Sequence, residues 1–195
     1  MKKIVLLLFI LAFTPSVSMA GTDFVLSVHP GSLLISPDVD GFTASNGYYS
    51  EEISGVGSWI PSINGGVGFD LPSMYIDLTV GTGYLVNGAF TGPFYQGDVA
   101  LRFKLGQVIT LGPHLSLIRY DLSWDGSENV ELSPTTGVAP GLCLTAGGKK
   151  VAFSMNLDYV NASVDAESQD RNVRLSSDSI DLSGIALSLG VIFRF

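Results

Sequence analysis

Apolar and polar residues alternate with a period of two through most of the chain after residue 20. The segment 59–71 shows this pattern, with Ile63 and Val67 on the apolar parity. Asn64, Gly66, Gly68 and Asp70 stand on the other parity. An α-helix repeats every 3.6 residues and a strand every two, so the alternation predicts β-strands with one apolar face.

Eight segments carry this alternation, near residues 24–28, 59–71, 74–84, 95–105, 108–124, 138–144, 151–159 and 185–195. Pro30 and Gly31 interrupt the first of them. In the fifth, the apolar parity changes between Leu117 and Tyr120. One inserted residue turns every later side chain to the opposite face, so we expect a β-bulge near Ile118.

The segments are long for a soluble protein. A soluble β-sandwich also alternates apolar and polar residues, but its strands usually have about five or six residues, and a barrel strand that crosses a bilayer needs about 9–11. An open sheet edge in hydrocarbon would leave unpaired N–H and C=O groups, so the sheet must close. The expected fold is an all-β, eight-stranded antiparallel up-and-down transmembrane β-barrel.

The connections alternate in length as such a barrel requires. Short turns are expected at 71–73, 105–107 and 147–149, and longer polar loops near 36–56, 87–93, 125–134 and 164–180. With both termini on the periplasmic side, the four long loops face the cell exterior. Two aromatic girdles are expected, from Trp59, Tyr84, Tyr95, Trp124 and Tyr159 towards the loops and from Phe24, Phe69, Phe103 and Phe195 towards the turns.

The first twenty residues have the features of a secretory signal peptide. Lys2 and Lys3 precede an apolar run, and Ser18-Met19-Ala20 is a small-residue cleavage pattern. The run before Pro15 is too short for a transmembrane helix, which needs about 20 residues. We therefore expect a signal peptide over 1–20 and one outer-membrane barrel domain over 21–195.

Charge and composition exclude several classes of function. The 10 Lys and Arg, less Lys2 and Lys3, stand against 18 Asp and Glu, which leaves a mature charge of 8 − 18 = −10. Such a chain is not expected to bind nucleic acid, because that affinity depends on basic side chains. Cys143 is the single cysteine, and the two histidines have no metal-site spacing, so neither a metal nor a cofactor is expected.

The last eight residues resemble the terminal signal of bacterial outer-membrane proteins, with matches at Ser188, Gly190, Phe193 and Phe195. The resemblance implies that the barrel-assembly machinery reads this segment and that outer-membrane lipid surrounds the protein. The overall pattern is similar to the small barrels typified by the OmpA transmembrane domain and OmpX.

Parity places several charged side chains inside the expected barrel. The central set is Asp98, Arg102, Arg119, Asp121 and Asp158, and a second set nearer the turns is Asp70, Asp77, Lys104 and Arg194. The interior of an eight-stranded barrel is just wide enough for side chains to fill, so we expect these charges to pair and close the lumen. The alternative is a narrow conduit for small or hydrophobic solutes; an OmpW-like conduit would favour an apolar lumen.

One motif has a catalytic resemblance. His114-Leu115-Ser116 with Glu128 is similar to the catalytic residues of the lipid A deacylase PagL, in which serine is the nucleophile and histidine the base. Leu117 stands where that family has asparagine, and parity turns His114 and Ser116 inward. A lipid A-modifying enzyme is thus the third hypothesis, and we expect a non-enzymatic protein with a structural or surface-interaction role. Its acidic loops are candidates for binding cations or a basic partner.

Overall fold

The structure is a computed structural model that describes residues 21–39, 42–45, 50–53, 57–125, 130–170 and 172–195. The predicted signal peptide at 1–20 and the loop residue Glu128 lie outside these ranges. No helix in the described part of the chain has the length and apolar character needed to cross a membrane.

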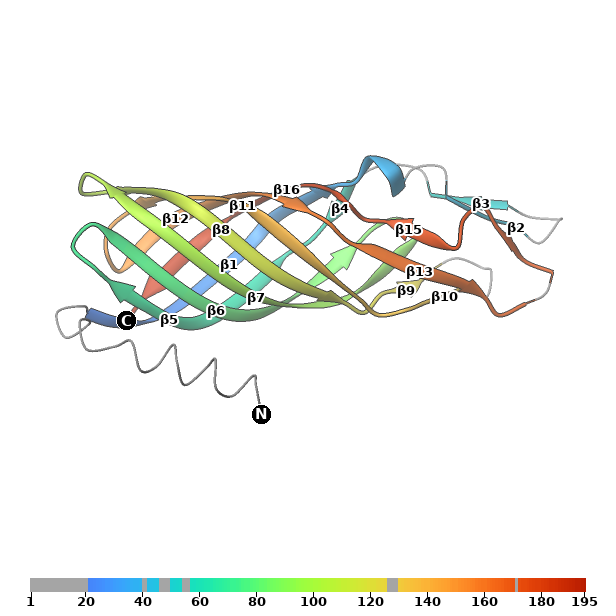
Figure 1. Ribbon diagram of the computed structural model, residues 1–195, viewed down its shortest axis with the longest axis horizontal. Coiled ribbons are helices and arrows are strands. Elements are labelled where there is room, and N and C mark those ends of the chain that lie inside the picture. Colours follow the sequence, from blue (N-terminus) through green and yellow to red (C-terminus); the bar gives the residue numbers. More distant parts are fainter. Residues whose placement is uncertain (1–20, 40–41, 46–49, 54–56, 126–129, 171) are drawn as a thin grey trace, which may run out of the picture.

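Eight long strands form a closed antiparallel barrel (Figure 1). They are β1 (Gly21–Ile35), β5 (Ser62–Asp70), β6 (Met74–Val86), β7 (Phe90–Leu105), β8 (Ile109–Tyr120), β11 (Thr135–Gly147), β12 (Val151–Val160) and β16 (Gly184–Arg194). Each pairs with the next along the chain, and β16 pairs back with β1, where Val25 lies opposite Arg194. The predicted fold class is confirmed.

The outer face of the barrel is an apolar band. Along β8, Leu111, Leu115 and Leu117 are exposed, whereas the intervening His114 and Ser116 are buried. By the same alternation, each of the eight strands exposes large apolar side chains on its outer face. Since a soluble monomer rarely exposes so large an apolar surface, this band is the lipid-facing surface of an integral membrane barrel.

Leu115→Arg tests the lipid-facing assignment. Leu115 lies in the middle of β8, opposite Val99 and Pro140 of the neighbouring strands, and arginine near the bilayer midplane costs about 2–4 kcal/mol. We expect a loss of that size in the free energy of unfolding from phospholipid vesicles. The control is Leu105→Arg at the turn-side end of β7, where the cost is about 0–1 kcal/mol. Equal losses in the two variants would contradict the assignment.

The bulge expected near Ile118 is absent from β8, whose register with β7 and β11 is unbroken. Parity therefore continues to the strand end. Tyr120 and Leu122 are buried inside, and Arg119 and Asp121 are exposed. The apolar parity changes because the interior of the barrel becomes apolar at this height. The irregularity lies in β1 instead, where the register with β16 shifts between Val28 and Gly31.

The long loops contain strands that the sequence analysis did not predict. One sheet joins β10 (Val130–Leu132), β13 (Ser163–Ser168) and β15 (Ser179–Asp181), and another joins β14 (Arg174–Leu175), β2 (Thr43–Ser45) and β3 (Ser50–Glu52). Three short elements remain. One is the 3-10 helix η1 (Pro37–Val39), and the others are β4 (Gly57–Trp59), which pairs with β1 and β6, and β9 (Ser123–Trp124), which pairs with β7.

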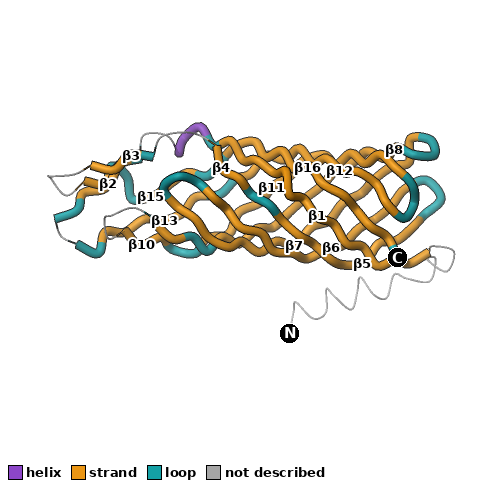
Figure 2. The backbone as a smooth tube through the Cα atoms, turned by 180° about the vertical axis from the view of Figure 1, so that it is seen from behind, coloured by secondary structure: helices purple, strands orange, loops and turns teal. Residues whose placement is uncertain are grey.

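The two loop sheets extend beyond the loop side of the barrel, where Figure 2 labels β2, β3, β10, β13 and β15. We call the described residues 36–39, 42–45, 50–53, 121–125, 130–134, 161–170 and 172–183 the loop crown. Its strands pair residues from different loops, as between β10 and β13 or β14 and β2. Trp124 was predicted for the loop-side aromatic girdle but is half-buried in the crown. Its ring meets that of Phe42 edge-on, with 5.7 Å between the ring centroids.

Candidate functional site

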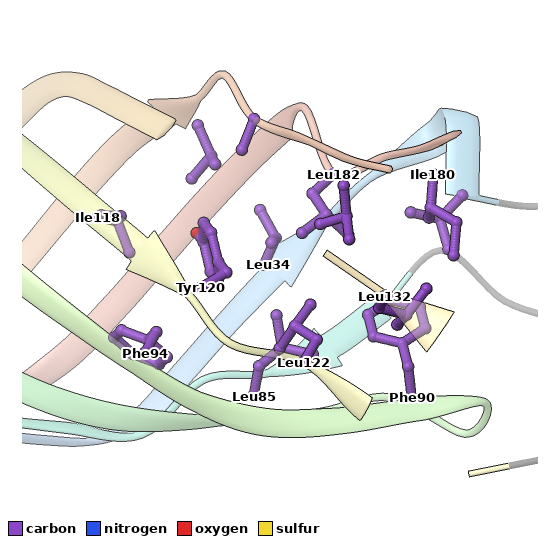
Figure 3. Packing of buried hydrophobic residues seen from close by; sticks show 14 of the residues in the cluster. Leu34, Leu85, Phe90, Phe94, Ile118, Tyr120, Leu122, Leu132, Ile180 and Leu182 are labelled. Atoms are coloured by element: carbon purple, nitrogen blue, oxygen red, sulfur yellow. The ribbon is translucent and has the colours of Figure 1, made fainter. Parts of the chain in front are cut away.

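Buried apolar side chains fill the loop-side half of the barrel (Figure 3). We call this group the apolar plug: Leu34, Leu85, Phe90, Phe94, Ile118, Tyr120, Leu122, Ala139, Val160, Leu182 and Ala186. It draws a residue from every spanning strand except β5. The plug is continuous with the core of the crown, which includes Phe42, Leu132 and Ile180.

The plug is an apolar barrier in addition to the charge pairs that were expected to close the lumen. Leu34, Leu85 and Phe90 are 0% exposed, so their atoms are packed on all sides. Around these three side chains the packing leaves no space for a solute, because protein interiors have few voids larger than a water molecule. The loop-side end of the lumen is therefore closed by side chains.

Below the plug, His114 is the centre of a polar network. Its Nδ1 atom lies 2.8 Å from Asp158 Oδ1, and its Nε2 atom lies 3.3 Å from Ser116 Oγ. The Nε2 atom is also 3.8 Å from Asp98 Oδ1. The hydroxyl of Ser116 donates to Asp98 at 2.5 Å. One histidine thus lies between two buried carboxylates.

Further hydrogen bonds complete this network. Asp98 Oδ2 accepts from Thr79 at 3.2 Å and from the side chain of Gln96 at 3.1 Å. His29 Nε2 on β1 lies 2.8 Å from Ser154 Oγ on β12. Two cavities of ≈ 40 Å³ each adjoin these groups. Such a volume holds a few water molecules, since one needs roughly 10–15 Å³, but it does not hold a lipid chain.

His114 contacts Asp158 on one side and Ser116 on the other, as the histidine of a serine hydrolase triad contacts its aspartate and its serine. In such a triad the serine proton goes to histidine, whereas here the single hydroxyl proton of Ser116 is donated to Asp98. The serine is 4% exposed and lies under the plug. These groups form a buried hydrogen-bonded network, and Glu128, the third residue of the catalytic resemblance, lies outside the described residues.

A second cluster lies nearer the turns. Asp77 accepts hydrogen bonds from both Arg102 and Arg194, and Arg194 Nη1 is also 3.6 Å from Asp23 Oδ2. Gly68 leaves room for the cluster, because a Cβ atom there would lie 2.6 Å from Arg194 Nη1 and 2.7 Å from Asp77 Oδ1 and these side chains would have to shift. The guanidinium groups of Arg102 and Arg194 and the carboxylate of Asp77 thus connect β7, β16 and β6 across the lumen.

At the turn-side rim, Lys104 and Lys149 share one carboxylate. Lys104 donates to Asp70, and Lys149 Nζ donates to Asp70 Oδ2 at 3.2 Å. This hydrogen bond, together with the charge of Asp70, raises the pKa of the Lys149 ammonium above its ordinary value. Cationic side chains therefore gather at this end of an otherwise acidic protein.

The crown carries an open groove of ≈ 650 Å³ on its outer surface. Asp165, Glu167 and Asp178 line it, and among the described residues no lysine, arginine or histidine does. Backbone hydrogen bonds hold its walls together, from Ser133 N to Asp165 O and from Ala166 N to Asp178 O, each at 2.9 Å. The groove presents negative charge on a hydrogen-bonded frame.

Two outer-membrane proteins are among the solved structures that this chain matches. The outer membrane protein OprG from Pseudomonas aeruginosa has a TM-score of 0.49 and 12% identity, over 90% of this chain and 97% of that chain. Neisserial surface protein A (NspA) has a TM-score of 0.48 and 16% identity, over 90% of this chain and 99% of that chain. No protein-family model and no curated protein matches the sequence.

The chain is an outer-membrane β-barrel. That conclusion rests on its own closed strand pairing and apolar outer band. It agrees with the resemblance to small eight-stranded barrels seen in the sequence.

The five charges predicted for a central network separate into three groups. Asp98 and Asp158 meet at His114, while Arg102 belongs to the cluster with Asp77. The prediction that Arg119 and Asp121 face the lumen is wrong, because both are exposed beside the inward Tyr120. The continuous parity of 109–122, read without a bulge, would have placed them correctly.

The residues of the predicted assembly signal lie on and beside β16. Ser188 and Gly190 are half-buried on the inner side, where a Cβ atom on Gly190 would lie 2.1 Å from Val28 O. Phe195 is exposed, and its ring centroid is 6.2 Å from that of Phe24 on β1. The role of this segment in assembly stays a prediction.

Proposed function

We propose that this protein is a non-enzymatic outer-membrane barrel that uses its loop crown to bind a positively charged partner at the cell surface. The barrel anchors the crown, and the lumen is filled by side chains. The observation that carries the proposal is the acidic groove bounded by Asp165, Glu167 and Asp178.

Two features support binding at this groove. The first is order: β13 is held on both sides, by β10 and by β15, so its side chains have fixed positions before a partner arrives. Preorganisation reduces the entropy that association costs. The second is charge, since three carboxylates with no cation among the described lining residues attract a basic partner and increase its rate of association.

The other two hypotheses have less support. A conduit needs a continuous path, and the apolar plug lies across the loop-side half of the lumen. A lipid-modifying enzyme needs a nucleophile that a lipid can reach, whereas Ser116 is buried inside the barrel wall and donates its proton to Asp98.

Neutralising the groove tests the proposal. The triple variant Asp165→Asn, Glu167→Gln, Asp178→Asn should bind a short oligolysine peptide about tenfold more weakly than the wild type. The reason is that exposed charge pairs contribute about 0.2–1 kcal/mol each. The measurement is fluorescence anisotropy of the labelled peptide with detergent-solubilised protein at low salt.

A second triple variant controls for net charge. Glu52→Gln, Asp121→Asn and Asp125→Asn also remove three exposed negative charges from the crown, but these residues do not line the groove. This variant should retain most of the wild-type affinity. Equal loss in the two variants, or no loss in the groove variant, would contradict the groove as the binding site.

A further inference from the structure

We propose that the turn-side mouth of the barrel contains a binding pocket for a phosphate group. This pocket is separate from the groove of the crown and does not depend on the function proposed for it. A cavity of ≈ 230 Å³ lies there, lined by residues of the turns β7–β8 and β11–β12 and by the adjoining strand ends. In the expected orientation this mouth faces the periplasm.

The lining of the pocket is cationic. Arg102, Lys104, Lys149 and Arg194 all line it, and in the described part of the chain no aspartate or glutamate does. The mature chain has eight Lys and Arg in all, which is 10 less the two in the segment 1–20. Half of its basic side chains therefore meet at one cavity, although the chain as a whole is strongly acidic.

Three of these cations converge on one aromatic ring. The Tyr75 ring centroid lies 4.2 Å from the guanidinium carbon of Arg194, 4.4 Å from Lys104 Nζ and 5.7 Å from the guanidinium carbon of Arg102. Like charges this close repel each other, and stacking on a ring offsets only part of that repulsion. Neighbouring carboxylates offset more of it, and a bound anion would add to this compensation.

The internal carboxylates do not satisfy this set of donors. Asp77 is shared by two arginines, Asp70 is shared by two lysines, and Asp23 lies 3.6 Å from Arg194 Nη1, so four cations have three carboxylates. Arg102 is 2% exposed, and no acceptor among the described residues reaches its Nε atom. A buried donor without an acceptor is costly, and an oxyanion or water in the pocket would supply one.

The chemistry of the lining favours phosphate. Arginine donates from a planar fork that fits the paired oxygens of a phosphate group, and lysine adds a point charge. Thr110 adds a hydroxyl to the lining, where its Oγ1 atom is 2.6 Å from that of Thr145. Free phosphate in the periplasm and the headgroup of an inner-leaflet phospholipid have this chemistry in common.

Thermal unfolding in an uncharged detergent tests the pocket. Inorganic phosphate at constant ionic strength should raise the Tm of the wild-type protein in a saturable way, whereas chloride should not, because only an anion bound to the folded state stabilises it. Lys104→Gln with Lys149→Gln should weaken phosphate binding at least about tenfold, as charge-assisted hydrogen bonds are lost.

Two further variants keep the test decisive. Lys149→Gln alone changes a side chain that is 78% exposed, so the protein should fold normally and bind phosphate more weakly. Lys150→Gln is the matched control, since Lys150 is the next residue, is exposed and does not line the pocket. Equal weakening by Lys149→Gln and Lys150→Gln would overturn the proposal in favour of general surface charge.

A second arm identifies the source of the phosphate group. Micelles doped with phosphatidylglycerol are compared with micelles doped with phosphatidylcholine, using the same variants. A saturable rise in Tm with phosphatidylglycerol but not with inorganic phosphate, lost in Lys149→Gln, supports the pocket and assigns a lipid headgroup. The reverse pattern assigns a soluble phosphate. Failure of both probes to shift the Tm beyond the chloride control overturns the proposal.

Discussion

Asp77→Asn should destabilise the barrel by about 3–5 kcal/mol, the range for removing one partner of a buried ion pair. Asp77 is the carboxylate that Arg102 and Arg194 share, and its side chain is buried with them. Asparagine keeps the size of the side chain but removes the charge, so two guanidinium groups would be left in the lumen without their common counterion. The measurement is urea unfolding of the protein in phospholipid vesicles.

The matched control for this variant is Asp23→Asn. Asp23 is 3.6 Å from the same Arg194, but its side chain is 30% exposed at the turn-side rim. Exposed pairs contribute about 0–1 kcal/mol, so this change should have a small effect. A loss of less than about 1 kcal/mol in Asp77→Asn would show that water screens the cluster and that the lumen is wet at this height.

Most of the fold could be predicted from the sequence because a bilayer and a narrow lumen impose the same two-residue period on every strand. Along β12, for example, Phe153, Met155 and Leu157 face outward, as their alternation indicates. The short turns were predictable too. Gly106 has φ +88, a conformation that glycine adopts readily, and it stands in the predicted turn between β7 and β8.

Alternation gives the parity of a side chain but not the surroundings on each side. Tyr120 and Leu122 are apolar, and alternation from Leu117 would place them on the lipid side only if a bulge intervened. In the structure both belong to the apolar plug. An apolar residue near a strand end fits lipid and an apolar interior equally well, and the choice depends on strands far away in the sequence.

The pairing of charges was not predictable for a similar reason. Asp98 and Arg102 are close in sequence and share a face of β7, but their partners come from other strands. Asp98 meets Ser116 of β8, and Arg102 meets Asp77 of β6. Strand register decides these contacts, and the alternation alone leaves register open. The short crown strands depend in the same way on pairing between separate loops.

Phe90→Ala should cost about 3–5 kcal/mol, the range for deleting a fully buried phenylalanine side chain. Phe90 is 0% exposed, lies at the loop-side start of β7 and belongs to the plug. Removing the ring leaves a cavity between the barrel and the crown. Phe153→Ala on β12 is the control, because Phe153 is 74% exposed towards lipid, which can fill the space left by its ring.

The same variant tests whether the lumen is sealed. The wild-type protein in a planar bilayer should show little steady conductance, because the plug and the Arg102–Asp77–Arg194 cluster both lie across the lumen. Phe90→Ala should also be silent, since Tyr120, Leu122, Leu182 and the other plug residues still fill the lumen. Its loss of stability would then come from packing alone. Well-defined channels from the wild-type protein would contradict the sealed lumen and favour a conduit over surface binding.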